Sequence, residues 1–189
     1  RARRLVVGDE AVGLAVDRSV SRLFRGGVQF NLPKGATKQQ EYINTIWDLN
    51  KKEILMYQAG LHGAVYGTWY FKISPNAIID PYTLEPYPRL IALDPEITRV
   101  KTHPQDMNDV EFYKIEYTCK EMRDGREIVV THKEITKHAE MEAYDESYHA
   151  RMERAETWII ETWEQLEGGQ MMLLSIQPWD YDFPPIIHC

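Results

Sequence analysis

The stretch VEFYKIEYTCKEMRDGREIVVT, residues 110–131, decides the fold of this chain. Apolar and polar residues alternate on both sides of Asp124-Gly125, and this dipeptide favours the two-residue turn of a β-hairpin. We therefore expect a long strand over residues 110–121, a tight turn, and a returning strand over residues 127–131. Such a hairpin predicts an antiparallel sheet.

Further strands are predicted before and after this hairpin. Aromatic and β-branched residues mark each of them, and turn-forming residues bound them. Pro75 predicts a turn directly after the first strand, and three prolines between Asp80 and Pro88 predict a loop before the second. The predicted strands are residues 67–73, 89–93, 97–100, 157–166 and 170–177, and the last two form a hairpin around Gly168-Gly169.

Helical periodicity dominates the first third of the chain. Apolar residues recur at steps of three and four over residues 9–25, where a pair of glycines ends the pattern. Thr37 and Gln40 have the spacing of a capping box, which predicts a second helix that ends near residue 50. A third helix is predicted over residues 54–65, and its Gly60 would allow another backbone to approach closely.

The order of these elements predicts an α+β fold, with N-terminal amphipathic helices followed by an antiparallel sheet. We expect a single domain over residues 1–189, mainly helical over 1–66 and mainly strand over 67–189. Residues 133–156 are densely charged and keep apolar residues at helical steps, so we expect a solvated amphipathic helix there, with irregular strand as the alternative. Neither end reads as a natural terminus, so we expect further sequence on both sides.

Composition limits the classes of partner. The net charge of −7 and the pI near 5.4 argue against a surface that binds nucleic acid by neutralising phosphates. The two cysteines, Cys119 and Cys189, cannot build a disulfide framework or a four-ligand zinc site. No apolar run approaches the roughly 20 residues of a membrane-spanning helix, and the start lacks a secretion signal. We therefore expect a soluble protein of a reducing compartment that contacts no membrane.

Motifs of catalysis are absent from the sequence. It has no phosphate-binding glycine loop, dinucleotide fingerprint, serine-nucleophile elbow or zinc-protease motif. His138 with Glu142, and His149 with Glu153, would lie one turn apart on a helix and could share a metal ion. A solvated charged face is the favoured interpretation, because no third ligand is spaced to join either pair. We expect no catalytic residue, no cofactor and no metal.

The alternative hypothesis, that the protein is an enzyme, rests on three aspartates. Asp80, Asp94 and Asp109 all occur in turn-like contexts, where aspartate usually caps or bends the backbone. The alternative is a metal-dependent nucleic-acid-processing domain that uses these carboxylates.

The five tryptophans could be ligand platforms or core residues. Trp47, Trp69, Trp158 and Trp163 fall inside periodic segments, which favours core packing. Trp179 lies in a loop-like stretch, so we expect it to be exposed, either as an interface anchor or packed within its loop.

Five phrases, in this order, resemble the portal proteins of tailed bacteriophages. They include a helix end with a glycine pair, a small-residue passage into an aromatic strand, a Leu-Asp-Pro turn, and a proline-rich run into Pro-Ile-Ile-His. The charged stretch over residues 138–156 has no counterpart in this resemblance. The phrases are SRLFRGGVQF (21–30), AGLHGAVYGTWYFK (59–72), LDPE (93–96), FYKIEY (112–117) and FPPIIH (183–188).

The resemblance implies a structural, non-enzymatic protein. It implies a ring of typically twelve subunits at one vertex of the phage head, assembled in the bacterial cytoplasm, through which double-stranded DNA passes without sequence-specific binding. A terminase motor, the capsid or scaffold, and head-completion proteins would be its partners. The matched parts correspond to the outer wing, and the stem helices, clip and tunnel loop would follow Cys189. A generic protein-interaction module is a further alternative.

Overall fold

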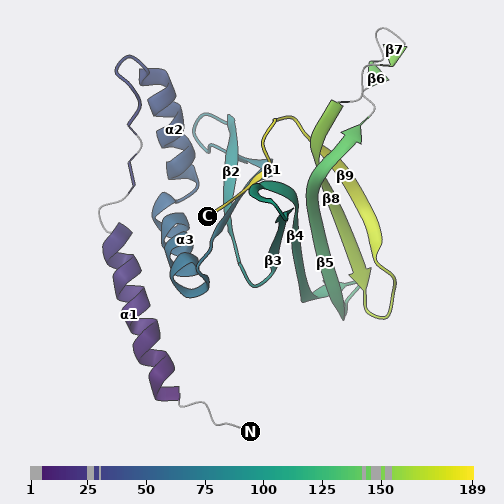
Figure 1. The fold of residues 1–189 in the computed structure, drawn as a ribbon, viewed down its shortest axis with the longest axis horizontal. Helices are drawn as coiled ribbons and strands as arrows, with labels where there is room; N and C mark the ends of the chain where they lie inside the picture. The colour runs from purple at the N-terminus through teal and green to yellow at the C-terminus, as the bar shows by residue number, and fades with distance from the viewer. Residues whose placement is uncertain (1–5, 25–27, 30, 142–143, 146–149, 152–154) are drawn as a thin grey trace. The chain divides into compact units, whose positions relative to one another are not determined.

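The computed structural model describes residues 6–24, 28–29, 31–141, 144–145, 150–151 and 155–189 (Figure 1). Three helices come first and antiparallel sheets follow, so the predicted α+β fold is confirmed. The chain nevertheless divides into two compact units, residues 1–95 with 187–189, and residues 96–186, where the sequence predicted one domain. The division follows from the sheets, because the strands on either side of Pro95 pair into two separate sheets.

The first unit combines the helices with a three-stranded sheet (Figure 1). All three predicted helices are present. The sheet has the strand order β10-β1-β2, and Trp69 and Cys189 exchange two backbone hydrogen bonds at its β10 side, 3.0 and 3.1 Å long. Its elements are α1 (Val6–Phe24), α2 (Thr37–Leu49), α3 (Lys52–Tyr66), β1 (Tyr70–Ile79), β2 (Pro86–Leu93) and β10 (Ile186–His188).

Gly60 lets helices α1 and α3 pack closely. A Cβ atom at this position would lie 2.5 Å from Phe24 Cε2 and 2.8 Å from Val20 Cγ1. Val20 is buried, and its β-branched side chain has little rotational freedom in a helix. The predicted close approach at Gly60 therefore exists, but side chains of α1, and not its backbone, fill the space.

The capping box predicted for α2 does not form. Ala36 occupies the N-cap position, and no side-chain hydrogen bond caps this end of the helix. Gln40 instead accepts a hydrogen bond of 2.9 Å from the backbone N–H of Leu32. The helix begins where predicted, but the hydrogen bond at its start comes from the segment that precedes it and not from a capping box.

Three prolines lie within β1 and β2, where the sequence predicted a turn at Pro75 and a loop over residues 80–88. Strand β1 continues through Pro75, and its pairing with β2 shifts register between Ser74 and Ile78, which accommodates a residue without an N–H. Strand β2 begins within the predicted loop and contains Pro86 and Pro88. It is an edge strand, where proline is tolerated.

The side chain of Asn50 covers part of this edge. Its Nδ2 donates to the Pro88 carbonyl at 2.9 Å, and its Oδ1 accepts from Leu90 N–H at 2.7 Å. An asparagine between α2 and α3 thus supplies hydrogen bonds that another strand would otherwise provide.

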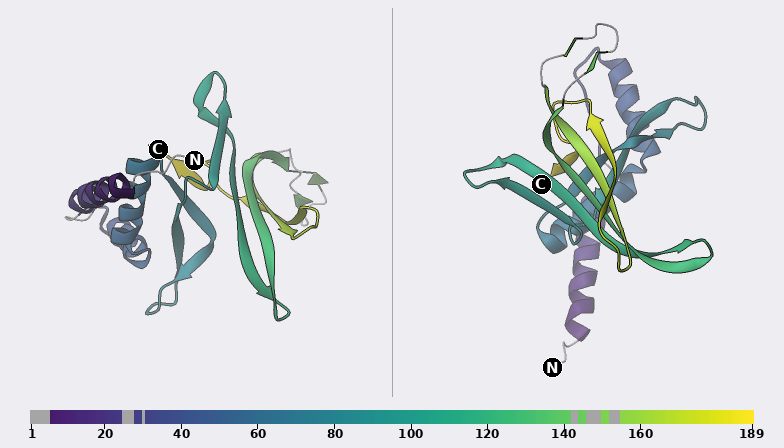
Figure 2. Two further views of the ribbon diagram at one scale, coloured as in Figure 1. Left: turned by 90° about the horizontal axis from the view of Figure 1, so that it is seen from below. Right: turned by 90° about the vertical axis from the view of Figure 1, so that its right-hand side faces the viewer.

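The second unit is a five-stranded antiparallel sheet of order β3-β4-β5-β8-β9, with long, bent central strands (Figure 2). Neighbouring strands are joined in chain order, so the sheet is a meander. A separate pair, β6 with β7, lies between β5 and β8 in the chain. The elements are β3 (Thr98–His103), β4 (Asp106–Arg123), β5 (Arg126–Met141), β6 (Tyr144–Asp145), β7 (Ala150–Arg151), β8 (Ala155–Leu166) and β9 (Met172–Trp179).

Both predicted hairpins are confirmed. Asp124 and Gly125 have positive φ angles of 52° and 75°, as the favoured two-residue turn requires, and Arg123 pairs with Arg126 across it. Strands β8 and β9 form the second hairpin, with Gly168 at φ 71° in its turn.

The helix predicted over residues 133–156 is wrong where the structure describes this stretch. Residues 133–141 continue β5, where residues 133–137 pair with β4 on one side and β8 on the other, and residues 138–141 pair with β8 alone. Hydrogen bonding to these neighbouring strands outweighs a weak helical spacing of apolar residues. Most of residues 142–154 lie outside the described part of the chain.

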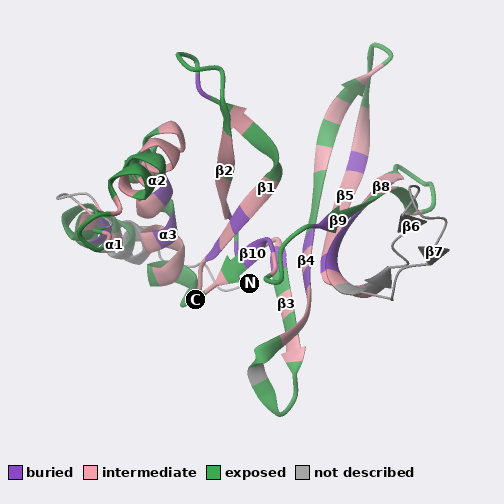
Figure 3. Cartoon of the chain, turned by 90° about the horizontal axis from the view of Figure 1, so that it is seen from above, coloured by how far each residue is buried: buried purple, intermediate pink, exposed green. Residues whose placement is uncertain are grey.

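Figure 3 marks the buried positions along the strands of this sheet, and one face of the sheet carries most of them in the second unit. The register places Tyr113 opposite Thr136, Thr136 opposite Ile160, and Trp158 opposite Trp179, so all of these side chains point to the same face. All five are buried. Bending and twisting of the long strands let a single sheet enclose this face.

Thr136 places a polar hydroxyl group in that core. Its side chain is 0% exposed, and its hydroxyl has no hydrogen-bond partner among the described residues. We expect Thr136→Val to raise the free energy of unfolding by about 1 kcal/mol, because a buried unsatisfied hydroxyl is removed at nearly constant shape. Urea unfolding measures the change. Thr118→Val is the control, since the exposed Thr118 hydroxyl bonds Thr131 at 2.9 Å, and a gain of equal size there would contradict the explanation.

Candidate functional site

A polar cluster occupies the same face of the sheet as the core, near the β4–β5 turn. Cys119, Glu121 and Arg123 alternate along β4, so their side chains point to one face. His132 of β5 and Glu164 of β8 are directly opposite each other in the register and share that face. The five side chains therefore come from three neighbouring strands of the second unit.

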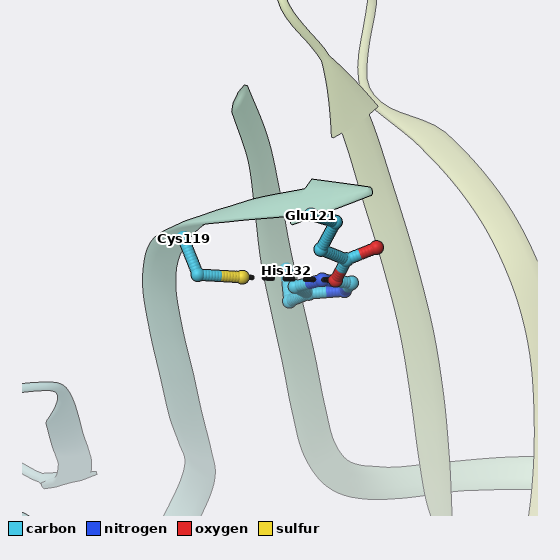
Figure 4. Close-up of side chains that lie close together, drawn as sticks. All are labelled: Cys119, Glu121 and His132. Carbon is cyan, nitrogen blue, oxygen red and sulfur yellow. Dashed lines mark hydrogen bonds and ion pairs between the residues drawn. The ribbon is translucent and has the colours of Figure 1, made fainter. Parts of the chain in front are cut away.

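A bend in β4 brings the cluster together. In the register Glu121 lies opposite Ile128, four residues before His132, which corresponds to about 13 Å on a flat sheet. Figure 4 shows β4 turning sharply beyond Cys119, so that Glu121 lies over His132. Glu121 Oε1 is consequently 2.5 Å from His132 Nε2 and accepts a hydrogen bond of 3.6 Å from Cys119 Sγ.

Arg123 joins the two carboxylates of the cluster. Its Nη1 and Nη2 donate to the two oxygens of Glu164 at 2.8 and 2.6 Å, a bidentate pair. Nη2 and Nε also donate to Glu121 Oε2 at 2.8 and 3.0 Å. Glu164 is buried, and its Oε1 lies 3.9 Å from Nδ1 of His132. The network thus holds the bent end of the hairpin onto β8.

These contacts set the charges of the cluster. Hydrogen bonds from Arg123, then from His132, lower the pKa of the Glu121 carboxyl, and those from Arg123 lower the pKa of Glu164. Burial, followed by the hydrogen bond to Glu121, raises the pKa of the Cys119 thiol. At neutral pH two carboxylates therefore face one guanidinium beside a protonated thiol. The cluster carries an excess of one negative charge, apart from His132.

The three aspartates of the enzyme alternative have other surroundings. Asp80 is buried in the first unit, where its Oδ1 accepts from Tyr82 N–H at 2.8 Å and shapes the turn after β1. Asp94 is exposed in the first unit, and Asp109 is exposed on β4 in the second. Within the described ranges, the acidic, histidine and cysteine ligand atoms that gather in threes belong to Cys119, Glu121 and His132, and not to these aspartates.

The helical histidine–glutamate pairs are not formed as predicted. His138 lies on strand β5, so it has no helical neighbour at four residues, and its ring centroid is 4.0 Å from that of Trp158. Its predicted partner Glu142 lies outside the described residues, as do His149 and Glu153.

The tryptophans mostly pack as predicted. Trp158 is fully part of the core, while Trp47, Trp69 and Trp163 are half-buried. The prediction that Trp179 is exposed is wrong, since only 7% of it is exposed. Strand β9 extends to this residue and pairs it with Trp158, so it lies on the core face and not in a loop.

Strand β9 presents an apolar edge. Its sequence MLLSIQPW contains no charged residue, and in the described part of the chain it has a paired strand on one side only. The opposite edge, β3, carries Arg99 and Lys101. Four apolar side chains of β9 are exposed, namely Met172 (51%), Leu173 (43%), Leu174 (54%) and Ile176 (49%).

Sequence reasoning missed the cluster around His132. Alternation of Cys119, Glu121 and Arg123 on a predicted strand places them on one face, and that signal was available. The bend that carries Glu121 to His132 has no sequence signal that we can identify. The β9 edge was also missed, because a strand's neighbours follow from sheet order and not from its own residues.

No protein-family model matches this chain, and no curated protein matches it either. In the described residues, no helix combines the length and the apolar character needed to span a bilayer. The fold and these two features define the class of the protein, an α+β chain of two units with a part-buried ion network and an uncharged, apolar sheet edge.

Proposed function

We propose that this chain is a structural subunit of a tailed-bacteriophage portal, the ring that joins head and tail. The observation that carries the proposal is the edge strand β9, which offers four exposed apolar side chains and no charge. Such an edge favours association with another protein surface, and a second copy of the same chain is the partner that a ring supplies.

The two edge strands of the second unit, β3 and β9, differ in charge, and this difference supports the proposal that β9 is a subunit contact. Natural sheets protect free edges with charges, and Arg99 and Lys101 do so on β3. Strand β9 lacks this protection. A register shift beside Leu174 and the proline at 178 interrupt its hydrogen-bonding pattern, so we expect apolar side-chain packing to dominate the contact.

Most of the phrases that resemble portal proteins fall at element boundaries, whereas residues 112–117 lie within β4. The phrase over residues 59–72 runs from α3 through Gly67, whose left-handed φ of 73° closes the helix, into the start of β1. Residues 93–96 mark the junction of the two units, and residues 183–188 lead into β10. Glycine and proline at such boundaries have backbone reasons, which is why these phrases carry fold information.

In the proposed role the protein is mechanical and needs no catalytic residue. Its ring, typically of twelve subunits, occupies one vertex of the capsid, where the terminase motor drives double-stranded DNA through it. Scaffold or capsid proteins and head-completion proteins contact it at different stages. An acidic chain, with a net charge of −7, suits a channel that must let DNA pass without holding it.

The particle mass of the full-length protein that contains this chain tests the proposal. Mass photometry is expected to give a particle of about twelve subunit masses, because the ring is the functional state. A mass equal to one subunit at every protein concentration and salt concentration tested would overturn the proposal.

A further inference from the structure

The cluster on β4 and β5 contains a set of metal-ligand atoms. Cys119 offers a sulfur, Glu121 an oxygen and His132 an imidazole nitrogen, and these atoms all lie within 4.8 Å of one another (Figure 4). Thiolate and imidazole together favour a borderline-soft divalent ion over calcium or magnesium. We propose that these three residues bind one Zn²⁺ ion per chain.

The spacing of the donors fits this ion. Zinc bonds of about 2.3 Å to sulfur and about 2.1 Å to oxygen, at a tetrahedral angle, place the two donors about 3.6 Å apart. Cys119 Sγ and Glu121 Oε1 are 3.6 Å apart. Glu121 Oε1 and His132 Nε2 are 2.5 Å apart and need to separate to about 3.4 Å, which side-chain rotation can supply. Metal binding would therefore replace the hydrogen bonds that now join the three side chains.

Arg123 orients one of the three ligands, because it donates to Oε2 of Glu121 and leaves Oε1 for the ion. Glu164 lies on the Nδ1 side of His132, at 3.9 Å, while Nε2 faces Glu121. A carboxylate behind a histidine ligand is common at zinc sites, and a small rotation of the His132 ring would bring Nδ1 within hydrogen-bonding distance of Glu164.

The charge balance also favours a divalent cation. Binding of Zn²⁺ would release the proton of the Cys119 thiol, so that three anionic groups face the guanidinium of Arg123, and the ion neutralises the resulting excess of two negative charges. The ligands are half-buried, so water can fill the fourth coordination position. The ion would tie β4 to β5 across the bend and so hold the hairpin in this shape.

Zinc titration of the full-length protein, stripped with chelator and followed by calorimetry, tests the site. Wild-type protein is expected to bind one Zn²⁺ per chain, and Co²⁺ in its place is expected to give a thiolate-to-metal charge-transfer absorption band. Cys119→Ser and His132→Gln should each weaken binding at least tenfold. Cys189→Ser is the matched control, because it removes the other thiol and should leave both signals unchanged.

Two results would overturn the site. The first is wild-type protein that binds no Zn²⁺, which requires no variant. The second is a Co²⁺ thiolate band that disappears in Cys189→Ser and persists in Cys119→Ser, with both variants shown to be folded by circular dichroism. The ring assembly is measured separately by particle mass, so failure of one proposal is distinguishable from failure of the other.

Discussion

The double substitution Leu174→Lys with Ile176→Lys is expected to convert the proposed ring of the full-length protein into single chains. Both side chains are about half exposed on the uncharged edge strand β9, so the substitutions leave the fold intact. In the assembled ring each subunit contact would then enclose two unpaired ammonium groups, and a buried unpaired charge is strongly unfavourable. Mass photometry measures the expected decrease in particle mass.

Met122→Lys is the control for this experiment. Met122 is an apolar residue of the same unit, 69% exposed near the β4–β5 turn, and the added charge is the same. We expect the control to keep the wild-type particle mass. A β9 double variant that is folded by circular dichroism and also keeps that mass would show that β9 is not a subunit contact.

Ile160→Ala is expected to lower the free energy of unfolding by about 2–5 kcal/mol. Ile160 is 2% exposed at the centre of the core face, opposite Thr136 on β5 and Gln177 on β9. The substitution removes three buried carbon atoms, and the bent sheet around it can close the resulting cavity only in part. Urea unfolding followed by tryptophan fluorescence measures the loss, since Trp158 lies two residues away on the same face.

Ile176→Ala provides the matched comparison. It deletes the same atoms from the same sheet, but Ile176 is 49% exposed, so the expected change is below about 0.5 kcal/mol. Equal losses at the two positions would contradict the assignment of the core to the Ile160 face.

The sequence predicted elements whose signals are local. The hairpin at Asp124-Gly125 follows from two adjacent residues that accept positive φ angles, and the three helices follow from apolar steps of three and four. The wrong predictions concern segments whose secondary structure depends on pairing with strands that are distant in the sequence. Residues 133–141 form strand because β8 pairs with all of them and β4 pairs with residues 133–137 as well, and Pro75 stays in β1 because a register shift accommodates it.

The candidate sites depended still more on tertiary structure. Alternation puts Cys119 and Glu121 on one face, but a flat hairpin would leave Glu121 far from His132. Only the bend of β4 joins them. Trp179 was misplaced for a similar reason, since its burial comes from pairing with Trp158 across β8 and β9 and not from its proline-flanked neighbours. Sheet curvature and strand order are collective properties, so no short stretch of sequence contains them.

In the proposed ring, copies of this chain stand side by side around a channel. Negative-stain electron microscopy of the full-length protein shows this arrangement without any variant. We expect ring-shaped particles with a central hole and about twelvefold symmetry. A field of dispersed single molecules, at concentrations where the protein is folded and undegraded, would contradict it.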